Sequence, residues 1–123
     1  MIKLVFTLRR LPHLSRAQFQ QYWREEHGPL VAKFRKELRI RRYVQVHTRE
    51  HPIDESLRSS RDAPEPFDGV AELWWDSLED LAAAFEEPAG QEAGTTLLED
   101  ERRFIDHARS PLWVGEEHVV IDG

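Results

Sequence analysis

The chain has 123 residues, of which 40% are hydrophobic, so one compact domain spanning residues 1–123 with its own core is expected. It contains no cysteine, which excludes disulfides, a thiolate nucleophile and a cysteine-based zinc site, and favours a cytoplasmic location. The formal net charge is −6, no apolar run is long enough to span a bilayer and no signal-peptide pattern opens the chain, so neither nucleic acid nor a membrane is expected as a partner.

The first part of the chain predicts a strand, a long helix and a second strand. Apolar residues occupy every second position over residues 2–9, which is the period of a half-buried strand. Ser15 opens a capping-box pattern, and apolar residues then recur at helical spacing, with an interruption expected near Gly28 and Pro29. Residues 40–48 are rich in β-branched side chains, which favour a strand.

A long polar segment, residues 49–66, separates the second and third predicted strands. It has few apolar residues and three prolines, and it is unusually long for a connection inside a compact domain. Both a lid over a ligand site and a mobile loop fit this composition.

The second part of the chain predicts two strands and two helices. Residues 67–75 contain a dense apolar run and form the third predicted strand. Ser77 caps a predicted helix that ends at Pro88, and a further short helix is expected over residues 96–103. Residues 114–121 end in β-branched side chains and predict the fourth strand.

The order β-α-β-β-α-β is typical of the ferredoxin-like α+β fold, in which helices cover one face of a four-stranded antiparallel sheet. Both faces of the second predicted strand carry apolar or aromatic residues, with Val44 and Val46 on one face and Tyr43 on the other. An uncovered face of this kind exposes more apolar surface than a monomer normally tolerates. We therefore expect a homodimer formed through the open sheet face, as a dimeric α/β barrel.

Three motifs lie on these elements, each occurring once: Phe19-x-x-Tyr22-Trp23-x-x-x-His27-x-Pro29, then Arg42-Tyr43-Val44-Gln45-x-His47, then Phe67-Asp68-Gly69-Val70-Ala71-Glu72-Leu73-Trp74. Together they resemble the EthD family, over roughly residues 2–121. The resemblance implies the fold of the dimeric α/β barrel group, which includes muconolactone isomerases, polyketide cyclases, cofactor-free quinone-forming monooxygenases and small haem-using enzymes. Because this fold hosts isomerisation, dehydration, cyclisation and oxidation, the chemistry has to be inferred from the site.

His27 is the first candidate for a catalytic role. A helical wheel places it in the same arc as Phe19 and Trp23, so its ring is expected to face inward. Pro29 cannot donate to the carbonyl of Glu25, so the helix should bend beside His27 and open space between helix and sheet. An imidazole with an ordinary pKa of about 6.5 can take or give a proton at neutral pH. The alternative is that His27 only satisfies backbone groups that Pro29 frees.

Tyr43, Gln45 and His47 are expected to form a polar row on the second strand, because side chains repeat every two residues. Such a row can orient a substrate oxygen, or it can form a polar seam between two subunits. The same alternatives apply to Glu72 and Trp74 on the third strand.

Trp23 and Trp74 are candidates for the walls of an aromatic ligand site, although both also fit a role in core packing. A metal site could be formed by His27, His47 and Glu72 only if the faces that carry them meet. Neither a metal nor an organic cofactor is expected.

The central hypothesis is a small-molecule enzyme with His27 as general acid or base and with Tyr43 or His47 as orienting donors. Trp23, Gln45, Glu72 and Trp74 are the expected substrate-binding residues. The expected substrate is a hydrophobic, aromatic or polyketide-like oxygenated metabolite, and the expected enzyme a lyase or dehydratase, a cyclase or an isomerase. The alternatives are a cofactor-free oxidoreductase or monooxygenase, and a non-catalytic accessory protein of a degradation pathway.

Overall fold

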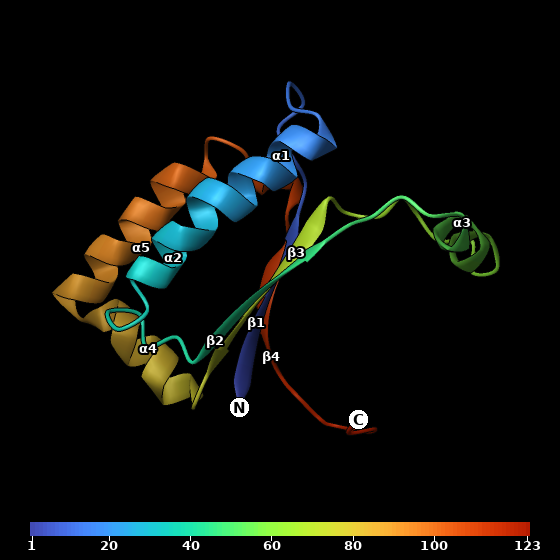
Figure 1. Cartoon of the computed structure of the whole chain (residues 1–123). Helices are drawn as coiled ribbons and strands as arrows, with labels where there is room; N and C mark the ends of the chain where they lie inside the picture. Colours follow the sequence, from blue (N-terminus) through green and yellow to red (C-terminus); the bar gives the residue numbers. More distant parts are fainter.

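One layer of the protein is a four-stranded antiparallel sheet with the strand order β2-β3-β1-β4, and helices form the second layer (Figure 1). The computed structural model describes residues 1–123. In chain order the elements are β1 (Ile2–Leu8), α1 (Arg16–Tyr22), a π-helical turn (Trp23–His27), α2 (Gly28–Lys33), β2 (Arg42–His47), α3 (Pro52–Ser59), β3 (Gly69–Trp75), α4 (Leu78–Glu86), α5 (Pro88–Glu101), a 3₁₀ turn (His107–Arg109) and β4 (Leu112–Glu116). The α+β class and the ferredoxin-like order predicted from the sequence are confirmed.

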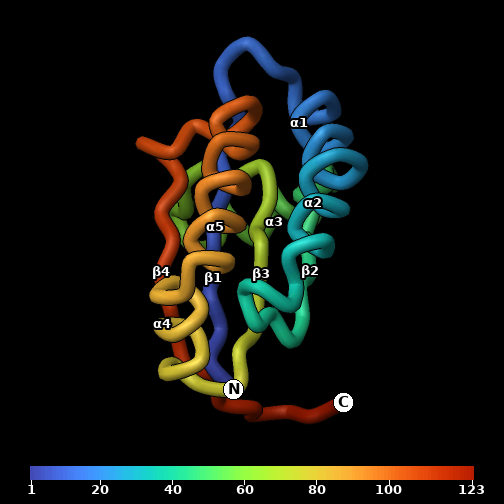
Figure 2. Tube along the Cα trace, turned by 90° about the vertical axis from the view of Figure 1, so that its left-hand side faces the viewer, coloured from blue at the N-terminus to red at the C-terminus, as the bar shows by residue number.

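Helices α1, α2, α4 and α5 lie on the same face of the sheet, with α5 beside α1 and α2, and with α4 below α5 (Figure 2). The buried apolar side chains between the layers form two clusters. One cluster contains Phe6, Leu8, Phe19, Trp23, Ala71, Phe104 and Ile105, and the other contains Val31, Leu38, Ile40, Trp75, Ala93 and Leu97. None of the helices combines the length and the apolar character that crossing a membrane requires.

The long first helix begins at the predicted capping box. Ser15 Oγ accepts a hydrogen bond from the Gln18 N–H (3.1 Å), and the Gln18 side chain accepts one from the Ser15 N–H (2.9 Å). The expected interruption before Pro29 is a π-helical turn, in which the Gly28 N–H donates to the Trp23 carbonyl. Pro29 has no N–H to donate, so the turn widens here and the α-helical ladder is interrupted.

The helix after β3 and α4 differs from the prediction. Pro88 begins α5 instead of ending a helix, and α5 runs without a break to Glu101, so the predicted short helix over residues 96–103 is wrong. Proline is unstrained at the first helical position, because its missing N–H would have no intrahelical partner there. Gly90 allows α5 to start close to α4, since a Cβ at this position would lie 1.7 Å from the Ala84 carbonyl oxygen.

The last strand is also shorter than predicted. β4 pairs with β1 over residues 112–116, whereas the predicted strand covers residues 114–121. Val119, Val120 and Ile121 are exposed and belong to no strand of the sheet. Their β-branched side chains favour extended backbone, but a strand also needs a neighbouring strand within reach.

The predicted polar loop, residues 49–66, contains a helix, α3, that the sequence pattern did not predict. His51 caps this helix by accepting a hydrogen bond from the Ile53 N–H (3.1 Å), and Pro52 occupies its first position. No residue of α3 is buried. The helix stands away from the sheet, on the side opposite the other helices (Figure 1).

Asp68 ties the loop after β1 and the start of α1 to the beginning of β3. Its side chain is buried, and its carboxylate accepts hydrogen bonds from the Arg10 N–H (2.8 Å), the Arg10 guanidinium (2.5 Å) and the Arg16 guanidinium (3.0 Å). Burial by itself would raise the pKa of Asp68, but the hydrogen bonds from Arg10 and Arg16 outweigh it and hold the pKa below its ordinary value.

Replacing Asp68 by Asn is expected to lower the free energy of unfolding at pH 7 by about 2–3 kcal/mol, because charged hydrogen bonds are lost from a buried site. A carboxyl pKa that is lowered in the folded state stabilises that state fully above the unfolded pKa of about 4, and the stabilisation is lost as the pH falls through the lower folded pKa. The difference in urea unfolding between wild type and Asp68→Asn should therefore shrink as the pH is lowered toward about 3.

The matched control for this prediction is Asp76→Asn, because Asp76 forms an ion pair with Arg41 in which both side chains are exposed. This change should alter the free energy of unfolding by less than about 0.5 kcal/mol. An equal loss of stability in the two variants would show that burial of Asp68 does not increase its contribution to the free energy of unfolding.

Candidate functional site

A cavity of about 250 Å³ lies between the helix layer and the sheet. Of its 19 lining residues 16 are hydrophobic, and His27, Tyr43 and Glu101 are the titratable ones. Close-packed protein interiors contain few voids larger than a water molecule, so an apolar space of this size favours a bound small molecule over a purely structural role.

The cavity opens beside the edge strand β4. Phe85 of α4, Leu98 of α5 and Leu112 of β4 line it and are also exposed to solvent. Gly94 lies among them, and a Cβ at this position would come within 3.0 Å of the Phe85 ring. The width of the entrance therefore depends on these four residues.

His27 reaches the cavity from the π-helical turn, and its ring lies inward as the helical wheel predicts. Its Nδ1 lies 2.7 Å from Oδ2 of Asp100 on α5. An ionised carboxylate can only accept a hydrogen bond, so Nδ1 carries a proton, and in the neutral form of the ring Nε2 presents a lone pair. The ring caps no backbone group, although His27 is the residue directly before α2. Its hydrogen bond to Asp100 thus leaves the second ring nitrogen available for proton transfer.

Further side chains hold the Asp100 carboxylate and the His27 ring in position. The Tyr22 hydroxyl donates to Asp100 Oδ1 (2.5 Å), and Arg103 Nε lies 3.9 Å from the same oxygen. Burial and the neighbouring Asp100 raise the pKa of Tyr22, which keeps its hydroxyl protonated as a donor. The Phe104 ring lies 5.0 Å from the His27 ring, centroid to centroid, and packs against it.

The polar row on β2 faces the helices. Gln45 Nε2 donates to the Trp23 carbonyl (3.0 Å) and to the Tyr43 hydroxyl (2.7 Å), and Gln45 Oε1 lies 2.8 Å from His47 Nε2. Burial, and to a lesser extent the charge of Arg24, lowers the pKa of His47, so this ring is neutral at pH 7. Of these three residues only Tyr43 lines the cavity. Gln45 bonds the Tyr43 hydroxyl, and His47 bonds Gln45, so both hold Tyr43 in position from outside the cavity.

Tyr43 is the hydrogen-bond donor that this arrangement offers to a ligand. Burial raises the pKa of Tyr43, so its hydroxyl stays protonated at neutral pH. Because the hydroxyl oxygen accepts from Gln45, the O–H is free to donate into the cavity.

Trp23 forms part of the cavity wall and of the core at the same time. Its side chain is buried, and its ring packs on Phe19 (5.7 Å between centroids) and stacks on His47 (4.4 Å). Gly69 of β3 lies directly under this ring, since a Cβ there would come within 2.4 Å of it. The two roles proposed for Trp23 from the sequence are therefore compatible.

The family model for the EthD domain matches residues 11–108. The chain belongs to the EthD family. This match includes both partners of the Asp100–His27 hydrogen bond and the whole polar row on β2. Among curated proteins, no sequence matches this EthD chain.

Solved structures similar to this EthD chain share its fold at low sequence identity. An EthD family protein from Bacillus halodurans is 21% identical with a TM-score of 0.62, and the match covers 96% of this chain and 100% of that one. A dimeric protein of unknown function with a ferredoxin-like fold from Bacteroides fragilis is 9% identical with a TM-score of 0.59, covering 94% and 95%. SnoaB, a cofactor-independent oxygenase from Streptomyces nogalater, is 15% identical with a TM-score of 0.55, covering 99% and 97%.

Glu72 and Trp74, which the sequence predicts as substrate-binding residues or as part of a polar seam between subunits, do not line the EthD cavity. On β3 the cavity is lined by Ala71, Leu73 and Trp75, and the alternation of a strand places Glu72 and Trp74 on the opposite face. There Lys3 forms an ion pair with Glu72 (3.0 Å). Its ammonium also lies 4.7 Å from the centre of the Trp74 ring. The metal set that includes Glu72 is not brought together either.

Three polar residues of the EthD site were missed by sequence reasoning. Asp100 and Glu101 lie at the end of α5, and Glu101 lines the cavity and lies 3.0 Å from His107 Nε2. Tyr22 entered the sequence analysis only as a member of the first motif. Asp100 is 73 residues from His27 along the chain, so only the fold reveals their contact.

Proposed function

We propose that this EthD protein is a small-molecule enzyme that moves protons on a hydrophobic, aromatic or polyketide-like oxygenated substrate, as a lyase or dehydratase, a cyclase or an isomerase. The Asp100–His27 hydrogen bond carries the proposal, because it orients a histidine that lies in the wall of an apolar cavity. The apolar lining selects a hydrophobic substrate, and Tyr43 selects one with an oxygen that accepts a hydrogen bond.

The neutral ring of His27 is the general base in this proposal. Nε2 takes a proton from a phenol or from a carbon next to a carbonyl group, and the electron pair moves to the substrate oxygen. Tyr43 donates a hydrogen bond to that oxygen as its negative charge develops. Asp100 stabilises the imidazolium that forms, since its carboxylate lies 2.7 Å from Nδ1. Return of the proton to another atom of the substrate completes an isomerisation, and its return to a leaving hydroxyl group completes a dehydration.

His47 and Gln45 are positioning residues in this scheme. Both act through Tyr43, because Gln45 bonds the Tyr43 hydroxyl and His47 bonds Gln45. These two hydrogen bonds fix the direction of the Tyr43 hydroxyl, and His47 does so without contacting the substrate.

A cofactor-free oxygenase is the second candidate, and the structural likeness to the cofactor-independent oxygenase SnoaB favours it. The same deprotonation yields an electron-rich phenolate or enolate, which molecular oxygen can oxidise when the site holds it away from water. Oxygen consumption during turnover distinguishes this candidate from a lyase or isomerase.

The test begins with a thermal-shift screen of phenols, quinones, lactones and small polycyclic aromatics. A ligand at 100 times its dissociation constant should stabilise the folded protein by about 2.7 kcal/mol. Each ligand found is then incubated with the protein in D₂O, and proton NMR follows the exchange of its carbon-bound acidic hydrogens and its conversion to product. Binding with exchange or conversion is the expected result. Binding without either would favour the non-catalytic accessory protein, and the absence of any ligand would contradict a small-molecule site.

We also propose that the protein pairs as a homodimer through the open sheet face. The strand register aligns Val44, Glu72, Val5 and Trp113 in one row across this face, so three of four side chains in the row are apolar. The similar protein from Bacteroides fragilis, which has a ferredoxin-like fold, is dimeric, and this supports pairing of the present chain. Sedimentation equilibrium should give twice the chain mass for the wild type and the single chain mass for Val44→Asp, which places a charge in the middle of the row. A monomeric wild type would contradict the proposal.

A further inference from the structure

Helix α3 (Pro52–Ser59) exposes an apolar side to solvent. Ile53 and Leu57 are four residues apart, so they lie on the same side of the helix, and they are 57% and 49% exposed. Glu55 and Ser59 lie on the opposite side. An isolated helix shorter than about 12–15 residues is marginal in water, so a helix of 8 residues with no buried side chain needs a surface to pack on.

Residues 48–67, here called the arm, are fixed to the body at their base. The Arg9 guanidinium donates to the Pro66 carbonyl (2.7 Å), and the Thr48 hydroxyl donates to the Phe67 carbonyl (2.6 Å). Both ends of the arm are therefore held against the sheet end where β2 finishes and β3 begins. These contacts set the direction in which the arm leaves the body.

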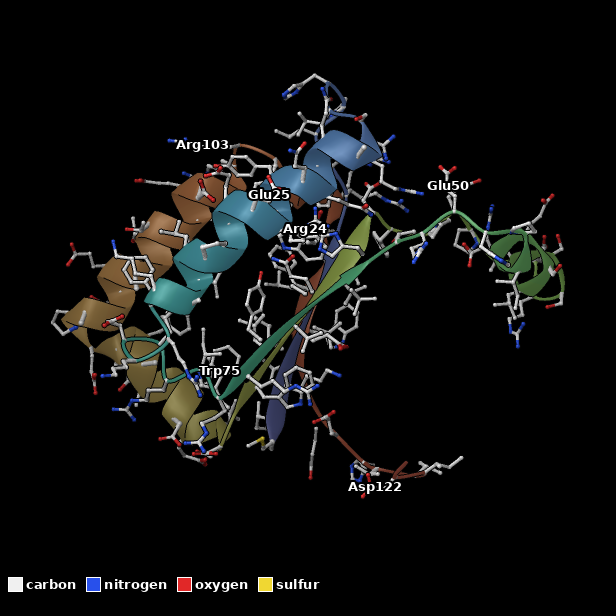
Figure 3. All side chains as sticks on the ribbon, viewed as in Figure 1. Arg24, Glu25, Glu50, Trp75, Arg103 and Asp122 are labelled. Atoms are coloured by element: carbon white, nitrogen blue, oxygen red, sulfur yellow. The ribbon has the colours of Figure 1, made fainter.

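The arm leads away from the sheet on the face that no helix covers, and Glu50 lies on it, well clear of the body (Figure 3). Residues 48–51 connect β2 to α3, and residues 60–68 connect α3 to β3. The shorter of the two connections can span at most about 13–14 Å. Stacked sheets lie about 10 Å apart. The connections are thus long enough to carry α3 level with, or past, a second sheet stacked on the open face.

We propose that α3 is a docking arm for a second copy of this chain, which it contacts through Ile53 and Leu57. This inference rests on the proposed sheet-to-sheet homodimer and adds a second contact region to it. In a two-fold symmetric pair each arm reaches around the sheet of the other copy, so the contact is made twice. The exposed C-terminal segment, residues 119–121, leaves the body on the same side and gives this side a second unpaired apolar segment (Figure 1).

Photo-crosslinking tests this contact directly, because the wild-type chain has no cysteine and a single one can be introduced. Ser56→Cys, beside the apolar side of α3, is labelled with benzophenone maleimide in an equal mixture of ¹⁴N and ¹⁵N protein that has been left to exchange subunits. The expected products are crosslinked dimers, half of which join a light peptide to a heavy one. Crosslinks confined to peptides of the same chain would overturn the proposal and show that the arm folds back on its own body.

Sedimentation equilibrium provides the second measurement. Leu57→Asp should raise the dissociation constant of the dimer at least about tenfold, whereas Ser59→Asp, which adds the same charge on the opposite side of α3, should change it less than about threefold. A dimeric wild type with equal dissociation constants for both variants would overturn the arm contact and leave the sheet-to-sheet dimer intact. A monomeric wild type would overturn both.

Discussion

Replacement of His27 by Gln is expected to slow proton exchange on a bound ligand by about 10²–10⁴-fold, with little change in the dissociation constant of that ligand. Gln keeps a polar side chain that can donate to Asp100, but it cannot take a proton at neutral pH. The measurement is the rate at which a carbon-bound acidic hydrogen of the ligand exchanges with deuterium, followed by proton NMR.

Two further variants test whether the slower proton exchange results from removing the base. Asp100→Asn should also slow exchange, at least about tenfold, because an amide no longer enforces the tautomer with a lone pair on Nε2. His13→Gln, at an exposed histidine outside the cavity lining, should leave the rate unchanged. Equal rates for wild type and His27→Gln would exclude His27 as the base, even with ligand binding intact.

Replacement of Trp23 by Ala is expected to lower the free energy of unfolding by about 3–5 kcal/mol. The Trp23 side chain is 1% exposed and fills the space between Phe19, His47 and Gly69. A domain of this size is stable by about 5–15 kcal/mol, so the change removes a large share of its stability. Urea unfolding at one fixed protein concentration measures the effect, because a dimer makes stability depend on concentration.

Trp23→Phe is the matched control, since it keeps an aromatic ring at this position and should lose much less stability than Trp23→Ala. A loss below about 1 kcal/mol for Trp23→Ala would contradict the packing described for this residue. If Trp23→Ala folds, the ligands that it binds should include larger members of the class found for the wild type, because the cavity wall has been removed.

Patterns that depend on a few neighbouring residues predicted the fold well. The capping box at Ser15 and the cap at Ser77 are both present, because each needs only a side chain and a backbone N–H three residues away. The prediction that Pro88 only ends a helix was incomplete, since proline is equally suited to follow one helix and to begin the next. The C-terminal strand was extended too far because the sequence shows β-branched residues at 119–121 but not whether a strand lies beside them.

The candidate site was predicted only in part for a related reason. Helical spacing identified the inward face of His27, and the two-residue period of a strand correctly grouped Tyr43 with His47. The same period also grouped Glu72 with Trp74, but it does not tell which face the helices cover, and these two lie on the other face. Contacts between distant segments require the packing of whole helices, which no local pattern contains.

The distance along the chain between His27 and Asp100 also determines when their hydrogen bond can form during synthesis. His27 and Asp100 are separated by 73 residues, and a ribosome adds these in roughly 4–15 s. Throughout that interval the nascent chain contains the histidine without the carboxylate that orients it. The proposed proton transfer is therefore possible only after α5 has left the ribosome and docked beside the first helix. Translation that stops before α5 would leave fragments that contain the histidine but have no means of using it.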